Sequence, residues 1–230
     1  MTTTFITGAN KGLGHETARR LIEQGHTVLL GARDEVAGAA AADKLGARFV
    51  RIDVTDDASV AAAAADVERH EGVIDVLINN AGIHGPFGVD PTGADVQAVL
   101  DVNVVGVVRT TEAFLPLLRR SADPVIVNVS SSMGSLAATH DPARAESRVI
   151  APAYTASKAA LTMLTTQYAK ALPGIRINAA DPGYTATDLN GHSGPQTVTE
   201  GTDAIVGLAT EGPGHGSGRF VDRDGEITWS

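Results

Sequence analysis

The chain has no cysteine, few aromatic residues and no long apolar run, and these absences narrow its function classes. Without cysteine there is no disulfide, no thiolate metal site and no cysteine nucleophile. Aromatic residues make up 4% of the 230 residues, and no apolar stretch approaches the length of a transmembrane helix. Basic residues are outnumbered, 18 against 27, and the formal net charge of −9 argues against nucleic acid or an anionic membrane surface as the main partner. Met1 is followed by three threonines and an apolar strand, which leaves no room for a signal peptide and predicts a cytoplasmic protein.

What the chain does contain is an alternation of short apolar runs with helical segments. The runs predicted as buried strands are 4–7, 27–32, 47–52, 74–79, 124–130, 175–180 and 218–222. The helical segments between them are 13–24, 35–45, 57–71, 92–119, 154–171 and 198–210. This alternation predicts one α/β domain over 1–230: a doubly wound parallel sheet (the Rossmann fold) with about seven strands and helices on both faces.

Two segments interrupt this alternation. They are 135–153, which is polar, charged and contains proline, and 183–198. Both follow the carboxyl ends of predicted strands, where ligands of such sheets bind. We expect them to shape a substrate pocket, and the alternative for each is a mobile surface excursion.

The stretch "FITGANKGLG", Phe5 to Gly14, places three glycines within seven positions after the first strand. At the first strand-to-helix turn, missing side chains let the backbone approach a pyrophosphate closely. The helix amino terminus there supplies free N–H groups and a partial positive charge. Gly8, Gly12 and Gly14 therefore indicate a dinucleotide site, with a plain tight turn as the alternative.

The spacing G-x-x-x-G-x-G, preceded by Thr7, resembles the cofactor motif of the short-chain dehydrogenase/reductase family. Further motifs follow in that family's order along essentially the whole chain: Asp53-Val54, "NNAG" (79–82), Asn103 in an apolar helical stretch, "NVSSSMG" (128–134), "YTASK" (154–158) and "DPGYTAT" (181–187). The chain is therefore identified as a member of that family. The resemblance implies an oxidoreductase that transfers a hydride between a nicotinamide cofactor and a carbonyl or alcohol.

Tyr154 and Lys158 are four residues apart, so on a helix their side chains share one face. A lysine ammonium about 5 Å from the phenol, at an effective dielectric near 20, favours the phenolate by roughly 3 kcal/mol. That corresponds to a pKa about two units below the usual 10. The resemblance implies that Tyr154 protonates the carbonyl oxygen during reduction, and that Lys158 lowers its pKa and holds the nicotinamide ribose.

Two further catalytic residues come from the resemblance. The family's serine stands three positions before a glycine, so Gly134 selects Ser131, with Ser132 as the runner-up and Ser130 as a strand cap. Asn103 is polar where the pattern requires an apolar residue, and a buried amide must be hydrogen-bonded. The resemblance implies that Asn103 positions a water molecule beside Lys158. The alternative is that this asparagine has only a structural role.

The cofactor predicted is NADP(H) rather than NAD(H), with no metal. Members that prefer NAD carry an acid at the tip of the second strand, where this chain has Ala32; Asp34, twenty positions beyond Gly14, lies past that tip. Arg33 follows the strand and Lys11 lies in the glycine loop, and two cations suit a 2′-phosphate. The residues that the resemblance assigns to the cofactor are Gly8, Asn10, Lys11, Gly12, Leu13, Gly14, Arg33, Asp53, Val54, Asn80, Ala81, Gly82, Tyr154, Lys158, Pro182, Gly183, Thr185 and Thr187.

Within the family, the likeness is to the monomeric carbonyl reductases and the plant reductases of menthone type, on "TGANKGLG", "GAR", "DPGYTATDLNG" and Trp229. The segment before Tyr154 is a short remnant of the insertion in that branch, so substrate shape and oligomeric state stay open. We predict an NADPH-dependent ketone or aldehyde reductase acting on a small molecule. The alternatives are NAD-dependent alcohol oxidation, and a non-catalytic NADP(H)-binding redox sensor, although such sensors usually lose the tyrosine or lysine. A halohydrin dehalogenase is disfavoured, because those enzymes lose the glycine motif and replace the lysine.

Overall fold

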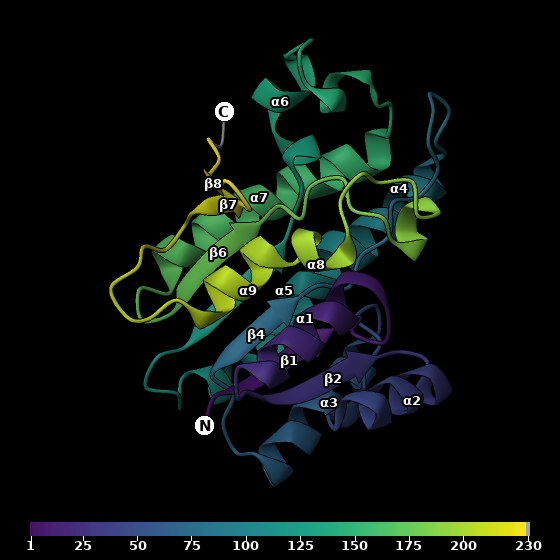
Figure 1. Cartoon of the computed structure of the whole chain (residues 1–230). Helices are drawn as coiled ribbons and strands as arrows, with labels where there is room; N and C mark the ends of the chain where they lie inside the picture. The colour runs from purple at the N-terminus through teal and green to yellow at the C-terminus, as the bar shows by residue number, and fades with distance from the viewer. Residues whose placement is uncertain (229–230) are drawn as a thin grey trace.

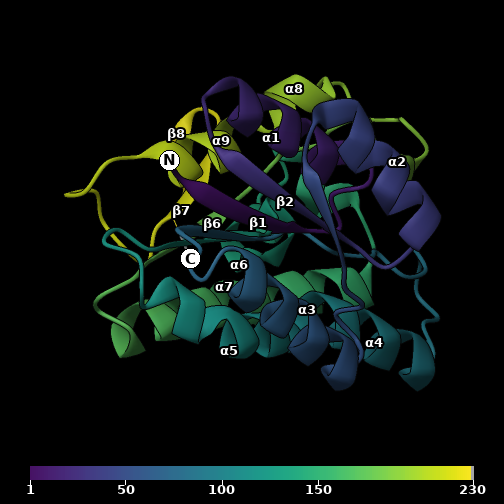
Figure 2. The ribbon, with the colours of Figure 1, turned by 90° about the horizontal axis from the view of Figure 1, so that it is seen from below.

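The computed structural model describes residues 1–228 and has three layers, with a sheet between two layers of helices (Figures 1 and 2). Within this range the sheet has eight strands in the order β3-β2-β1-β4-β5-β6-β7-β8. They are β1 (Thr3–Thr7), β2 (Thr27–Ala32), β3 (Arg48–Arg51), β4 (Val76–Asn79), β5 (Val125–Val129), β6 (Arg176–Ala180), β7 (Phe220–Asp222) and β8 (Gly225–Glu226). All pairings are parallel except that of β7 with β8. The chain therefore has the predicted doubly wound α/β fold.

The helices divide between the two faces of the sheet (Figure 2). One face carries α1 (Gly12–Glu23), α2 (Glu35–Leu45), α8 (Val198–Gly201) and α9 (Asp203–Thr210). The other face carries α3 (Asp57–His70), α4 (Gly93–Leu100), α5 (Gly106–Leu118) and α7 (Pro152–Ala171). Each face has its own apolar core, one built around Ile6, Leu30 and Ile205, the other around Phe5, Leu77 and Phe114. Side chains of successive β1 residues alternate between the two cores, as strand geometry requires.

Two of the predicted helices need correction, and one strand was missed. The helix expected over 92–119 is interrupted by a π-helical turn, η1 (Asp101–Val105), and the helix expected over 198–210 breaks between α8 and α9. The strand β8, at the sheet edge, was not predicted. Trp229, part of the likeness to the carbonyl reductase branch, lies outside the described residues.

The two predicted excursions both leave the carboxyl edge of the sheet. The first, 135–153, folds into a short helix α6 (Leu136–His140) and a turn η3 (Ala145–Arg148), and it projects above α7 in Figure 1. The carbonyl of Ile150 accepts a hydrogen bond from Gly88, at 2.9 Å, which joins it to the loop after β4. The second, 183–198, contains the turn η4 (Asp188–Asn190) and an isolated bridge between Thr185 and Gln196.

In the described part of the chain, no helix is both long and apolar enough to span a membrane. Nor does any group of three or more Asp, Glu, His or Cys side chains in that part come together to hold a metal ion.

Candidate active site

The glycine turn between β1 and α1 is shaped by two positive φ angles and two close approaches. Gly8 and Gly12 have φ of +64° and +56°, a region that favours glycine. A Cβ on Gly8 would lie 2.9 Å from the Cα of Ala81, and one on Gly14 would lie 2.5 Å from Nδ2 of Asn80. The first N–H groups of α1 have no side-chain cap, since Lys11 at the N-cap position makes no such bond. The turn thus presents free donors next to a close-fitting backbone.

The "NNAG" residues fasten this turn to the sheet. Nδ2 of Asn80 donates to the carbonyls of Thr7 and Gly8, at 2.8 and 3.0 Å. The backbone N–H groups of Asn80 and Ala81 both donate to the Thr7 hydroxyl at 3.0 Å. Asn10 lies in the turn itself, and Leu13 is packed against the apolar core beneath α1.

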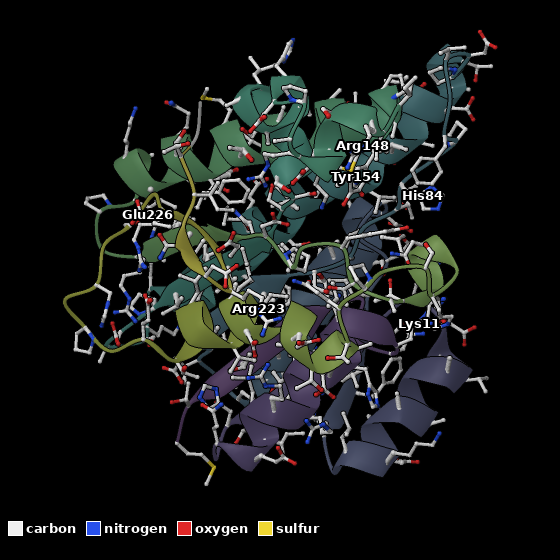
Figure 3. The ribbon with its side chains drawn as sticks, turned by 45° about the horizontal axis from the view of Figure 1, so that its top comes forward. Lys11, His84, Arg148, Tyr154, Arg223 and Glu226 are labelled. Carbon is white, nitrogen blue, oxygen red and sulfur yellow. The ribbon has the colours of Figure 1, made fainter. Side chains whose placement is uncertain are left out.

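Tyr154, Lys158 and Ser131 come together at the carboxyl edge of the sheet. Tyr154 and Lys158 share one face of α7, and Nζ of Lys158 lies 5.5 Å from the centroid of the Tyr154 ring. The Lys158 side chain is 5% exposed and donates to the carbonyl of Val129, the last residue of β5, at 2.8 Å. Ser131 follows β5 and makes a side-chain hydrogen bond with Tyr154. Figure 3 shows Tyr154 on α7 and, below it in that view, Lys11 at the start of α1.

The three consecutive serines have different surroundings. The Ser130 hydroxyl is buried and contacts the Thr162 hydroxyl at 3.1 Å, whereas the Ser132 hydroxyl donates to Glu146 at 2.6 Å. Only the Ser131 hydroxyl is placed toward Tyr154. Gly134 lets the turn after Ser131 pack directly against α7. A Cβ at this position would lie only 2.5 Å from the carbonyl carbon of Lys158, too close for a side chain.

Asn103 lies in the π-helical turn η1 and is 1% exposed. Its Nδ2 donates to the Ile83 carbonyl at 2.7 Å and to the Ser157 hydroxyl at 2.9 Å, and its Oδ1 accepts from the Ile83 N–H at 2.8 Å. These bonds tie the loop after β4 to α7. A Cβ on Gly82 would lie 3.3 Å from Oδ1 of Asn103 and 3.8 Å from Nζ of Lys158, so both atoms border the space beside this glycine.

The ionisation of Tyr154 differs from the prediction. Burial raises the pKa of Tyr154 to about 12; the negative charge of Asp181 adds to this increase, and the hydrogen bond with Ser131 opposes it. Burial also lowers the pKa of Lys158 to about 8, against the opposing effect of Asp181. The predicted lowering of the Tyr154 pKa is therefore wrong for the chain alone, because desolvation of the phenolate is the largest effect on it.

The residues predicted to contact the adenosine end of the cofactor lie where β2 and β3 terminate. β2 ends at Ala32 as predicted, and Asp34 caps α2 by accepting a hydrogen bond from the Ala37 N–H at 2.9 Å. Arg33 is exposed and makes no ion pair within the described residues; it lines a surface cavity together with Arg51 and Asp53.

At the end of β3, the Asp53 carboxylate accepts hydrogen bonds from the N–H and the hydroxyl of Thr55, two residues further along the chain, at 3.0 and 2.7 Å. These bonds, with the charges of Arg33 and Arg51, lower the pKa of Asp53 although burial acts in the opposite direction. Val54 is buried, with Gly106 of α5 packed against it.

The 183–198 segment meets the glycine turn. Pro182 and Gly183 follow β6, and the Thr187 side chain lies 3.8 Å from where a Cβ of Gly12 would stand. The Lys11 ammonium pairs with Asp188 at 3.2 Å, so in this structure it faces the segment. The hydroxyl of Thr185 is buried and donates to the Pro182 carbonyl at 2.8 Å, which occupies it within the segment.

Sequence reasoning missed several participants. Asp181, the first residue of "DPGYTAT", was not singled out, although its carboxylate is 5% exposed and close enough to affect both Tyr154 and Lys158. A charged residue directly after a buried strand was the available signal. The Val129 carbonyl and Ser157 could not be found from composition, because their roles depend on packing.

Comparisons with known proteins agree with this geometry. A family model described as short chain dehydrogenase matches residues 2–197. The short-chain dehydrogenase anuI of Penicillium roqueforti is 37% identical, with 97% of this chain and 94% of that protein covered. The (-)-isopiperitenone reductase of Mentha piperita is 32% identical, with 96% of each covered. The NADPH-bound carbonyl reductase from chicken fatty liver has a similar structure, with a TM-score of 0.87 at 28% identity, covering 99% of this chain and 98% of that one.

Proposed function

Because the chain belongs to the short-chain dehydrogenase/reductase family, we propose that it reduces a ketone or aldehyde of a small molecule with NADPH, Tyr154 acting as the acid. The observation that carries this proposal is the position of Tyr154 between the Ser131 hydroxyl and the buried Lys158 ammonium. A phenol so placed can hydrogen-bond a carbonyl oxygen that Ser131 also holds.

The glycine turn fits a dinucleotide cofactor. Gly8 and Gly14 let the turn pack closely against Ala81 and Asn80, and the uncapped amino terminus of α1 offers its N–H groups to a pyrophosphate. Thr187 lies beside Gly12 of this turn, and Gly82 lies beside the Lys158 ammonium. When bound, the nicotinamide supplies the hydride, and the protein's own groups manage the proton.

The ionisation state of the site suits reduction. With its pKa at about 12, the Tyr154 phenol keeps its proton at neutral pH and is ready to donate it to the carbonyl oxygen as negative charge develops there. Lys158 stabilises the phenolate that remains, and its short distance to the phenol ring makes this attraction strong in a dry site. Ser131 holds the substrate oxygen without exchanging a proton.

Tyr154 must then regain its proton. The space beside Gly82 is bordered by Oδ1 of Asn103 and Nζ of Lys158, and we propose that a water held there passes protons to Lys158. Three hydrogen bonds of the Asn103 amide fix its orientation, and its Oδ1 keeps one lone pair with which to hold this water.

Three features support NADP(H) over NAD(H). Ala32 leaves no carboxylate at the tip of β2, Arg33 is free of ion pairs within the described residues, and a structural relative binds NADPH. Lys11 would supply a second cation if the 2′-phosphate of NADP(H) replaced Asp188 as its ion-pair partner. We further propose that the excursions 135–153 and 183–198 line the substrate pocket, and that the reaction takes place in the cytoplasm.

The test is NADPH consumption, with NADH beside it, against a panel of ketones, diketones, quinones and aldehydes. Tyr154→Phe should lower kcat by about 10²- to 10⁴-fold, because the proton donor is removed and the ring is kept. Tyr168→Phe, on the same helix but packed against the core, is the matched control and should retain activity. Turnover that persists in Tyr154→Phe would contradict the proposal. Tight NADPH binding without turnover on any carbonyl would favour the redox sensor, and a clear preference for NAD⁺ with alcohols would favour the dehydrogenase.

A further inference from the structure

The half of α7 that carries Tyr154 and Lys158 is attached to the sheet mainly by hydrogen bonds. Within the described residues, neither apolar core includes a residue of α7 before Tyr168. Three of the five buried residues of this helix are polar, namely Ser157, Lys158 and Thr165. Buried polar groups need directed partners, so the positions of these partners determine how the helix lies on the strand beneath it.

Polar groups of the strand and of the helix meet in what we call the β5–α7 seam, formed by Asn128, Ser130, Lys158, Thr162 and Thr165. Nδ2 of Asn128 donates to the Thr165 hydroxyl at 2.9 Å. The Ser130 hydroxyl oxygen lies 3.1 Å from the Thr162 hydroxyl oxygen and 3.4 Å from the Lys158 carbonyl oxygen. The seam therefore joins α7 to the strand that leads into Ser131.

The spacing of these residues makes the seam continuous. Asn128 and Ser130 are two residues apart on extended backbone and therefore point to the same face of the sheet. Lys158, Thr162 and Thr165 are four and three residues apart, which places them on one face of the helix. Sliding the helix by one residue would move it about 1.5 Å and turn it about 100°. That would break the seam, because hydrogen bonds are lost beyond about 3.5 Å.

The bond between Asn128 and Thr165 is the most deeply buried part of the seam, since the two residues are 1% and 0% exposed. The Thr165 hydroxyl donates to the Leu161 carbonyl at 2.9 Å, which leaves its oxygen to accept from Asn128. Oδ1 of Asn128 accepts in turn from Nδ2 of Asn79, on β4, at 2.9 Å. The amide of Asn128 is thus held from both sides, and a lost partner cannot be replaced by bulk water.

We propose that the β5–α7 seam sets the register of the catalytic helix on the sheet, and that Thr165 is its main positioning residue. This inference rests on the proposed function, in which Tyr154, Lys158 and Ser131 act together on one carbonyl group. Ser131 follows β5 directly, whereas the other two residues belong to α7, so their separation depends on where the helix lies along the strand. Thr165 acts at a distance, because it lies seven residues, or about 10 Å along the helix, from Lys158.

Thr165→Val tests the proposal because it removes the hydroxyl and keeps the shape of the side chain. The buried Asn128 amide then loses its acceptor, and α7 should shift to relieve the unpaired donor. A displacement approaching 1 Å should lower kcat by about 10- to 100-fold. The affinity for NADPH should change much less, because the glycine turn is on another helix. Thr165→Ser keeps the acceptor and should restore kcat.

Thr110→Val is the matched control. Thr110 is also fully buried, but the hydrogen bond of its hydroxyl stays within its own helix, to the Gly106 carbonyl at 2.8 Å. The same substitution at this position should leave kcat at the native value. A native kcat in folded Thr165→Val, or an equal loss in Thr165→Val and Thr165→Ser, would overturn the inference.

A second measurement needs no turnover, so a failure of this inference is separable from a failure of the proposed function. In protein labelled with ¹³C-lysine, NMR detects the four lysines, and comparison with Lys158→Met assigns the Lys158 signal. Because Thr165 is too distant to alter this signal directly, a change reports movement of α7. The signal should change in Thr165→Val and keep its native position in Thr165→Ser and Thr110→Val. An unchanged signal in folded Thr165→Val would overturn the inference.

If Thr165→Val does not fold, Thr162→Val takes its place, since it removes a half-buried hydroxyl from the same seam. Thr166→Val is then the control, because the Thr166 hydroxyl donates to the Met163 carbonyl of its own helix at 2.8 Å. The Lys158 signal should change only in Thr162→Val. Equal Lys158 signals in these two variants would overturn the inference.

Discussion

Replacement of Gly134 by alanine tests whether the packing of η2 (Ser132–Gly134) against α7 sets the active-site geometry. The added Cβ would lie 2.5 Å from the carbonyl carbon of Lys158, 2.7 Å from the Ala159 nitrogen and 2.8 Å from the Lys158 oxygen. All three are backbone atoms, so no side chain can rotate away. Ordinary contact begins at about 3.4 Å, and the two elements must therefore separate by about 0.9 Å.

Two magnitudes follow from this displacement. Forcing a methyl group into a packed contact costs about 1–3 kcal/mol of unfolding free energy. A shift of about 1 Å between Ser131 and the pair on α7 is expected to lower kcat by about 10²-fold, which corresponds to about 2.7 kcal/mol of transition-state stabilisation. Cofactor affinity should change little, because the glycine turn lies on a different element.

Urea unfolding and steady-state reduction together check this prediction. Gly207→Ala is the control: Gly207 lies inside α9, and nothing stands within 4 Å of the position its Cβ would take. It should stabilise the protein by about 0.5–1 kcal/mol, because alanine favours the helix. If Gly134→Ala kept both native stability and native kcat while Gly207→Ala behaved as expected, the close packing would not be what positions the site.

Two further predictions concern charge. Arg33→Ala should weaken NADPH binding by about tenfold or more and leave NADH binding unchanged, as measured by fluorescence titration. Arg119, an exposed arginine at the C-terminal end of α5, provides the control. An equal loss of affinity for both cofactors in Arg33→Ala, or an equal loss of NADPH affinity in Arg119→Ala, would contradict a 2′-phosphate contact. Lys158 has a folded-state pKa of about 8 against an ordinary value of 10.5, so between these values the unfolded chain holds a proton that the folded chain lacks. The native protein should therefore gain up to about 3 kcal/mol relative to Lys158→Met as the pH rises through this window in urea unfolding. If the unfolding free energies of the native protein and of Lys158→Met changed with pH in parallel, burial would not lower the pKa of Lys158.

Most of the fold was predictable because its signal is local. Short apolar runs separated by helical segments specify a parallel sheet, and β2 and α2 begin and end where the pattern places them. The π-helical turn was not predictable, since it changes hydrogen-bond partners by one residue without changing composition. The short helix α6 within 135–153 was also missed, because a five-residue helix depends on what it packs against.

The candidate site was predictable in its members but not in its charges. The four-residue spacing of Tyr154 and Lys158 predicted that they share a helix face, and the family resemblance, through the glycine three positions after Ser131, predicted Ser131 beside them. The direction of the Tyr154 pKa was wrong, because desolvation depends on how many atoms surround the phenol. The burial of Asp181 could not be predicted for the same reason, because the strands and turns that bury it are distant in sequence.

The π-helical turn η1 has a consequence for how this site tolerates change. The N–H of Gly106 bonds to the Asp101 carbonyl five residues back, so one extra residue is accommodated in an otherwise continuous helical stretch from α4 to α5. In a regular helix each residue adds about 100° of rotation. The extra residue therefore turns α4 toward α7 while α5 stays packed on α3 and β4, and it aims Asn103 at Ile83 and Ser157. Loss of one residue from 101–105 would restore a regular helix but put its two halves out of phase with their partners, so the length of this stretch is as constrained as the identity of its asparagine.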